Sequence, residues 1–83
     1  MQTIEAVRAL LTSTLHLGAR GAGLRAGSGL LGELPELDSM AVMQLVAALE
    51  ARFGIDFEDE DISADTFATL ASLAAFVTSK QGA

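Results

Sequence analysis

Three stretches of the chain carry apolar residues at the three- and four-residue spacing of an amphipathic helix. This pattern predicts main helices over about residues 4–17, 39–53 and 66–79, and a short helix over about 58–62. No segment shows the apolar–polar alternation of a half-buried strand, and no internal repeat is present. We therefore expect an all-α fold, a small antiparallel bundle of three main helices plus one short helix.

The segment 18–38 interrupts the helical pattern. It holds most of the chain's eight glycines and its only proline, which predicts a long loop between the first two main helices. Several leucines in this segment suggest that it is ordered rather than disordered. With 83 residues in all, the chain is expected to form one domain, 1–83.

Composition narrows the range of functions. The chain has no cysteine, which excludes disulfides, thiolate metal ligands and a thiol nucleophile. A formal net charge of -6 at pH 7 argues against nucleic acid or an anionic membrane as the partner and favours partners with basic surfaces. Neither a signal peptide nor an apolar run of transmembrane length is visible, so we expect a cytoplasmic monomer that does not insert into membranes.

The helix predicted over 39–53 is apolar on both faces. At 100° per residue, the face expected to enter the core consists of Val42, Leu45, Val46, Leu49 and Phe53. The opposite face consists of Met40, Met43, Gln44, Ala47 and Ala51. Alanines on a surface helix can reflect helix propensity alone. Two methionines favour the other interpretation, a docking surface whose flexible thioethers repack against a partner.

Ser39 stands where this helix should begin. By itself it is typical of an N-cap, and a phosphate attached there would be stabilised by free backbone N–H groups and the helix dipole. Nucleophilic catalysis would need a nearby base and an oxyanion hole. His16 is the only histidine, and the chain has neither a G-x-S-x-G motif nor a strand to carry one. We therefore expect a protein that is not an enzyme, with Ser39 as the substrate of one.

Two other stretches are suggestive of ligand binding. The segment "DFEDEDISADTF" has alternating acids, but an EF-hand loop would need glycine where Asp61 stands and glutamate where Phe67 stands. A solvated acidic turn is the preferred interpretation, loose binding of divalent cations the alternative, and no defined metal site is expected. The stretch "GARGAGLRAGSG" matches no phosphate-binding loop and follows no strand.

The stretch "LDSMAVMQLVAALEARFGI" resembles the attachment-site region of acyl carrier proteins, in which Asp-Ser-Leu opens the second helix. Asp38, Ser39 and Met40 fall on that motif, and the acidic turn and "TFATLASLAAFV" extend the resemblance over nearly the whole chain. The resemblance implies that Ser39 carries phosphopantetheine, whose thiol holds acyl groups as thioesters for lipid or fatty acid synthesis. It implies as partners a phosphopantetheinyl transferase and enzymes that load and transfer acyl groups. The expected partner-binding residues are Met40, Met43, Gln44, Ala47, Glu50 and Ala51.

The chain departs from the family pattern at two places. Glu36 stands where the family usually has glycine, and the second helix keeps mainly Asp38 and Glu50 of the acids that the family presents to basic partners. These departures suggest a dedicated carrier, and "LPELDSMAV" is similar to stand-alone carriers associated with exosortase and exopolysaccharide gene clusters. The alternatives are an aminoacyl carrier, peptidyl or D-alanyl, and an unmodified helical adaptor.

Overall fold

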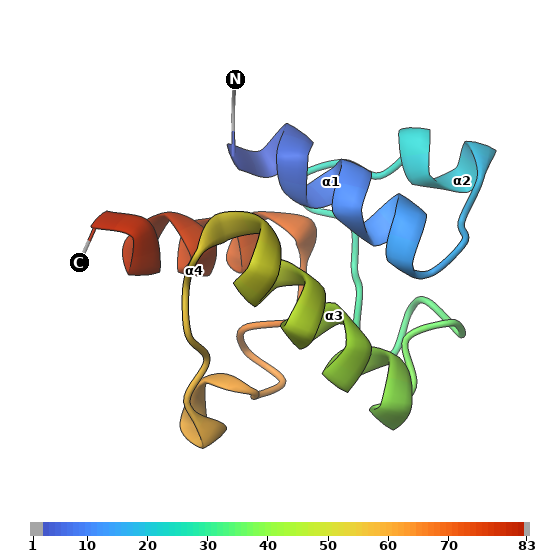
Figure 1. Ribbon diagram of the computed structural model, residues 1–83. Helices are drawn as coiled ribbons and strands as arrows, with labels where there is room; N and C mark the ends of the chain where they lie inside the picture. Colours follow the sequence, from blue (N-terminus) through green and yellow to red (C-terminus); the bar gives the residue numbers. More distant parts are fainter. Residues whose placement is uncertain (1–2, 83) are drawn as a thin grey trace.

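The computed structural model describes residues 3–82, which form a bundle of α-helices (Figure 1). The elements are α1 (Thr3–Thr14), α2 (Ala19–Ala22), α3 (Ser39–Phe53), the 3-10 turn η1 (Asp59–Asp61) and α4 (Leu70–Gly82). The only β-pairing among the described residues is an isolated antiparallel bridge between Gly29 and Thr69. The expected all-α fold, with a long connection between its first and second main helices, is confirmed.

The core lies where α1, α3 and α4 meet. In Figure 1, α1 lies above α3 and α4, and α2 lies beside α1 at the upper right. Fully burying one large aliphatic side chain is worth about 1.5–3 kcal/mol, so a few layers of leucine and valine are enough to hold the bundle. The largest fully buried side chains are Val7, Leu11, Leu30, Leu45, Leu49, Phe67, Leu70, Leu73 and Val77.

The first helix is shorter than the sequence pattern indicated: it ends at Thr14 rather than near residue 17. His16 adopts a left-handed conformation with φ 55°, and the Leu17 N–H donates to the Thr12 carbonyl at 3.0 Å. This arrangement caps the free carbonyls of the last turn and reverses the chain. Leu15 and Leu17 are nevertheless buried, which explains why the apolar pattern continues past the end of the helix.

The glycine-rich connection is ordered by packing and by backbone hydrogen bonds. Its one-turn helix α2 lies so close to α1 that a Cβ at Gly21 would overlap the Thr12 side chain. Further along, the Leu30 N–H donates to the Ala68 carbonyl at 2.9 Å. The loop predicted over 18–38 therefore contains a helical turn and pairs with the chain just before α4.

The last helix begins at Leu70 rather than near residue 66. The residues just before it are pulled into extended pairing with the glycine-rich loop, which buries Phe67 outside any helix. The start of α4 is fixed by a reciprocal pair of 3.0 Å hydrogen bonds, from the Ser72 N–H to Thr69 Oγ1 and from the Thr69 N–H to Ser72 Oγ. None of the helices within residues 3–82 is long and apolar enough to cross a bilayer.

Candidate functional site at the start of α3

Asp38, and not Ser39, is the N-cap of α3. Its backbone is extended, and its Oδ1 accepts a hydrogen bond from the Ala41 N–H at 2.8 Å. The expectation that Ser39 itself caps the helix is therefore wrong. A carboxylate on a short side chain can reach the N–H group three residues ahead just as a serine can, and it also complements the positive end of the helix dipole.

This shift of one residue leaves the Ser39 hydroxyl available. Ser39 is exposed as the first residue of α3, and within residues 3–82 its side chain has no hydrogen-bond partner. The N–H groups of Ser39 and Met40 belong to the first turn, where helix geometry gives them no intrahelical acceptor. An anionic group joined to Ser39 would therefore lie beside free donors at the positive end of α3.

Activation of Ser39 as a nucleophile would need a base close to its hydroxyl. His16 is exposed at the end of α1, and within the described residues no hydrogen bond joins it to Ser39. No group of three or more histidine, aspartate or glutamate side chains in residues 3–82 is arranged to hold a metal ion. The arrangement suits a serine that receives a group from another protein.

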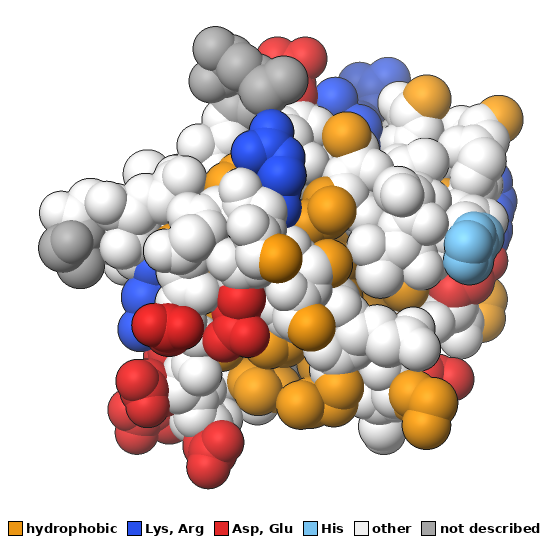
Figure 2. Space-filling model, in the orientation of Figure 1, with side chains coloured by type: hydrophobic (Ala, Val, Ile, Leu, Met, Phe, Trp, Pro, Cys, Tyr) orange, Lys and Arg blue, Asp and Glu red, His pale blue; other side chains and the backbone are white. Residues whose placement is uncertain are grey.

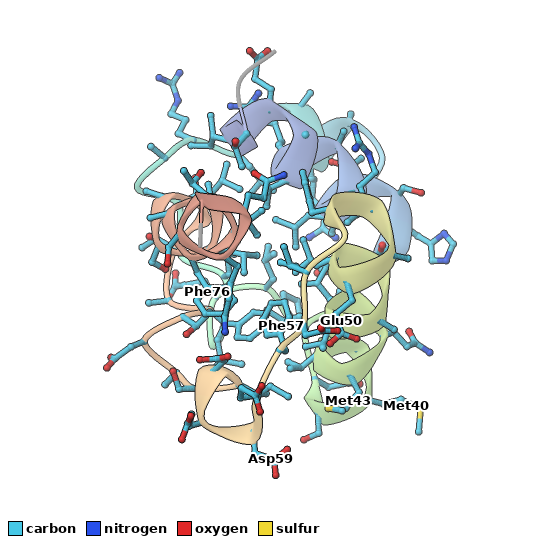
Figure 3. All side chains as sticks on the ribbon, turned by 60° about the vertical axis from the view of Figure 1, so that its left-hand side comes forward. Met40, Met43, Glu50, Phe57, Asp59 and Phe76 are labelled. Atoms are coloured by element: carbon cyan, nitrogen blue, oxygen red, sulfur yellow. The ribbon has the colours of Figure 1, made fainter. Side chains whose placement is uncertain are left out.

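The outer face of α3 is exposed beside this serine. Met40 is 72% exposed and Met43 is 55% exposed, and both project away from the core (Figure 3). Gln44, Ala47 and Ala51 are also exposed. The opposite side is packed, with Leu45 and Leu49 fully buried, and Val42 and Phe53 resting against the core. Ala41, which lies outside the face expected to enter the core, is buried as well.

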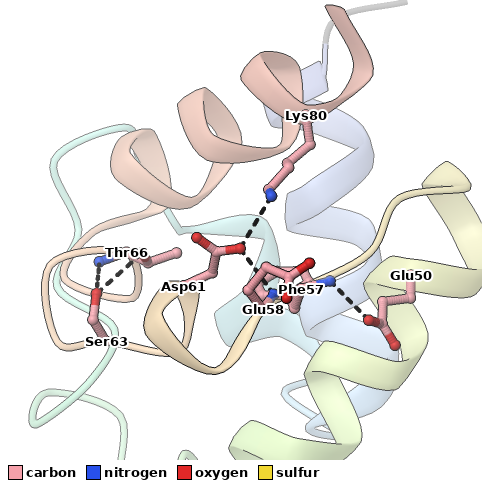
Figure 4. Close-up of polar contacts among 7 residues, drawn as sticks. All are labelled: Glu50, Phe57, Glu58, Asp61, Ser63, Thr66 and Lys80. Carbon is pink, nitrogen blue, oxygen red and sulfur yellow. Dashed lines mark hydrogen bonds and ion pairs between the residues drawn. The ribbon is translucent and has the colours of Figure 1, made fainter. Parts of the chain in front are cut away.

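Glu50 faces inward to the segment that follows α3. Its Oε2 accepts a hydrogen bond from the Phe57 N–H at 2.8 Å, and its side chain is only partly exposed (Figures 3 and 4). Phe57 in turn packs against Phe76 of α4, with ring centroids 4.8 Å apart. Sequence spacing does not predict this hydrogen bond, because the bond joins residues seven positions apart across the left-handed turn at Gly54. Glu50 thus has a structural role that the sequence analysis did not foresee.

The acidic turn follows α3 along the chain, and acidic side chains gather at the lower left of Figure 2. One of them is held firmly: Asp61 Oδ2 accepts from the Glu58 N–H at 2.9 Å and lies 3.1 Å from Lys80 Nζ of α4 (Figure 4). The Glu58 N–H lowers the pKa of Asp61 below its ordinary value, and Lys80 adds to this while partial burial opposes it.

A difference in acid sensitivity follows from this lowered pKa. As the pH falls, Asp61 takes up a proton at a higher pH in the unfolded chain than in the folded chain. The stabilisation of the fold by the Asp61 carboxylate is therefore complete above the ordinary pKa of 3.8. It is lost as the pH falls through the lower folded value. We expect Asp61→Asn to be less stable than the wild type near neutral pH and the gap to close in acid. Urea unfolding at a series of pH values measures it, and a gap independent of pH would contradict the assignment.

Glu36, which departs from the family pattern, takes part in an ion pair. Its Oε2 pairs with the guanidinium of Arg20 in α2, so the acid ties the connecting segment to the start of α3. The sequence contained both charges, but nothing in their spacing of sixteen residues showed that the chain would bring them together.

A family model described as a phosphopantetheine attachment site matches residues 32–77. The match covers more than half of the chain, which therefore belongs to this family of phosphopantetheine-binding proteins. Among solved structures, the chain is similar to the solution NMR structure of a holo acyl carrier protein from Nitrosomonas europaea. The two are 52% identical over 100% of both chains, with a TM-score of 0.92. None of the curated proteins compared with the chain matches it.

These findings confirm the resemblance to acyl carrier proteins. The prosthetic group of the family is phosphopantetheine, and the free hydroxyl and N–H groups at the start of α3 fit the phosphate end of such a group. The narrower similarity to carriers of exosortase and exopolysaccharide clusters stays a prediction.

Proposed function

We propose that this chain is an acyl carrier protein that bears phosphopantetheine on Ser39. The observation that carries the proposal is an exposed serine at the first position of a capped helix, without a hydrogen-bond partner in residues 3–82 and inside the region that matches the attachment-site family. Ser39 supplies the hydroxyl oxygen that a transferase joins to the pantetheine phosphate of coenzyme A. The pyrophosphate bond of coenzyme A breaks in this step, adenosine 3′,5′-bisphosphate leaves, and the hydroxyl proton is released. Asp38 holds the helix start in place, and the N–H groups of Ser39 and Met40 stabilise the phosphodiester.

The rest of the chain serves presentation rather than catalysis. The phosphopantetheine thiol, when bound, carries the acyl group as a thioester, while the helices offer a rigid platform from which the arm reaches partner enzymes. The protein acts as a cytoplasmic monomer and is not an enzyme. Its partners are a phosphopantetheinyl transferase and enzymes that load and transfer acyl groups.

Intact mass tests this function. Incubation with coenzyme A and a broad-specificity phosphopantetheinyl transferase is expected to add one phosphopantetheine, and the product is expected to accept a fatty acid from an acyl-loading ligase. Acceptance of an amino acid from an adenylating enzyme, but no fatty acid, would favour the aminoacyl alternative. A mass that does not change would favour the unmodified adaptor.

We propose further that the outer face of α3, formed by Met40, Met43, Gln44, Ala47 and Ala51, docks partner enzymes mainly by packing. Its side chains are exposed, and apolar or neutral, so the contact depends on shape and desolvation more than on charge. Glu50 and the neighbouring acidic turn speed encounter with a basic partner but contribute less to the final complex.

Met43→Glu tests this docking surface. A carboxylate buried against an apolar partner surface is costly, so we expect a loss of about tenfold or more in loading efficiency with the fold intact. Raising salt should weaken wild-type loading only modestly, because salt screens exposed charges far more than packing. Ala75→Glu, on the exposed side of α4, is the control with the same charge change. If wild-type loading depended strongly on salt and Met43→Glu loaded as efficiently as the wild type, partners would recognise the acidic turn instead.

A further inference from the structure

A cleft of about 330 Å³ lies between the end of α1 and the start of α3, next to the proposed attachment site. Asp38 and Met40, the residues on either side of Ser39 in the chain, both line it. Thr14 and His16 form the wall on the α1 side. A long group joined to Ser39 therefore has the cleft within its reach, although Ser39 itself is not part of the lining.

The polar side chains available in the cleft combine donors with acceptors. The Gln44 amide, the Thr14 hydroxyl and the His16 imidazole can each donate one hydrogen bond and accept another. None of these three side chains forms a hydrogen bond within residues 3–82. The two carboxylates of the lining are already engaged, that of Asp38 as the helix cap and that of Glu36 in an ion pair. The groups left for a ligand are therefore mainly neutral.

Apolar surface lies between these polar groups. Leu15 and Ala41 line the cleft and are buried, so they form its floor. Met40, at its rim, is 72% exposed (Figure 3). With hydrogen-bonding side chains on both walls and aliphatic groups between them, the cleft suits a flexible chain in which methylene segments alternate with amides.

Pantetheine is a chain of this kind. It is uncharged and consists of short aliphatic segments joined by two secondary amides, with a hydroxyl at one end and a thiol at the other. Each amide donates through its N–H and accepts through its carbonyl, so it needs both kinds of partner when it leaves water. The outer face around Met43 and Ala47 offers mainly aliphatic surface, on which an amide without a partner is costly. The cleft therefore fits the pantetheine amides better than that face does.

We propose that the pantetheine part of the arm on Ser39 lies in this cleft, against the end of α1, when no partner is bound. The inference rests on the proposed function, which supplies the arm. Attachment keeps the arm at a high effective concentration beside the cleft, so a few hydrogen bonds and apolar contacts are enough to hold it. Because Met40 and Gln44 also belong to the docking surface, a partner that packs there competes with the arm for the α3 wall.

NMR of the modified protein, with an isotope-labelled arm transferred from labelled coenzyme A, tests this placement. We expect nuclear Overhauser effects (NOEs) from arm protons to the Thr14 methyl group and to the His16 ring. At least one of the two arm amide protons should also resonate away from its position in free pantetheine, because it is hydrogen-bonded in the cleft.

Substitutions on the two walls make the test specific. Thr14→Val removes a hydroxyl and Gln44→Leu removes an amide, each with little change in shape, so either should weaken the NOEs to His16 by about threefold. Met43→Glu is the control, because Met43 is exposed on α3 but does not line the cleft, and it should leave these NOEs unchanged. Thermal melts check that each variant is folded, and the two wall substitutions are independent of each other.

The outcomes separate this inference from the proposed function. Arm NOEs confined to Met43, Ala47 or the acidic turn would overturn the inference and leave the proposed function intact. So would arm resonances identical to those of free pantetheine, or NOEs to His16 that are undiminished in both wall variants. Intact mass of the sample is measured first. A chain that takes up no phosphopantetheine would refute the proposed function, and the inference with it.

Discussion

Replacing Ser39 by alanine is expected to abolish phosphopantetheine uptake completely while the protein stays folded. The substitution removes the only atom of this residue that can form the phosphodiester. It should change the free energy of unfolding by no more than about 0.5 kcal/mol, because an exposed side chain away from a cap contributes little. The cap belongs to Asp38, whose bond to the Ala41 N–H does not involve Ser39.

Intact mass after incubation with coenzyme A and transferase measures the uptake, and urea unfolding measures the stability. Ser13→Ala is a matched control, because Ser13 is an exposed serine on α1 outside the matched region and should leave labelling unchanged. Modification that persists in Ser39→Ala would place the attachment site on another residue and would refute the assignment.

Leu45→Ala or Leu49→Ala is expected to destabilise the protein by about 2–5 kcal/mol. Both leucines are fully buried on the inner face of α3, at the junction with α1 and α4, so truncation leaves a cavity in the shared core. For a domain of this size, the loss amounts to a large part of its total stability and should lower the Tm by roughly 10 °C or more.

Met43→Ala on the same helix is the control for these truncations. Met43 is 55% exposed, so its loss should shift the Tm by far less than either leucine does. Thermal melts of the three variants, followed by circular dichroism, make the comparison. Equal losses for Met43→Ala and Leu45→Ala would mean that the two faces of α3 had been assigned in reverse.

Local interactions made much of the fold visible in the sequence. The range of α3 follows from residues a few positions apart, since its buried leucines recur every four residues and Gly54 adopts the left-handed conformation that ends it. The attachment motif is equally local, because Asp38, Ser39 and Met40 are consecutive. The absence of cysteine, the negative charge and the mixed exposure of α3 are also properties that composition and spacing express directly.

The ends of the other helices depended on contacts between distant segments. Apolar spacing continued through Leu17 and began again near Thr66, yet α1 stops at Thr14 and α4 starts at Leu70. In both places buried side chains sit outside the helices, because a chain reversal or pairing with the glycine-rich loop satisfies their backbone groups instead. Periodicity reports which side chains are buried, but it does not show where the hydrogen bonds of the backbone go.

The sequence by itself therefore determined an acidic all-α carrier and a serine at the start of its second main helix. Only the tertiary structure decided that Asp38 caps that helix, that Glu50 accepts a hydrogen bond from the Phe57 backbone, and that Glu36 pairs with Arg20. Either Asp38 or Ser39 could have capped the helix, and the backbone geometry selects Asp38. The other two contacts join residues that only the folded chain brings together. Burial and spacing are encoded along the chain, whereas the partner of each polar group depends on how the helices are placed.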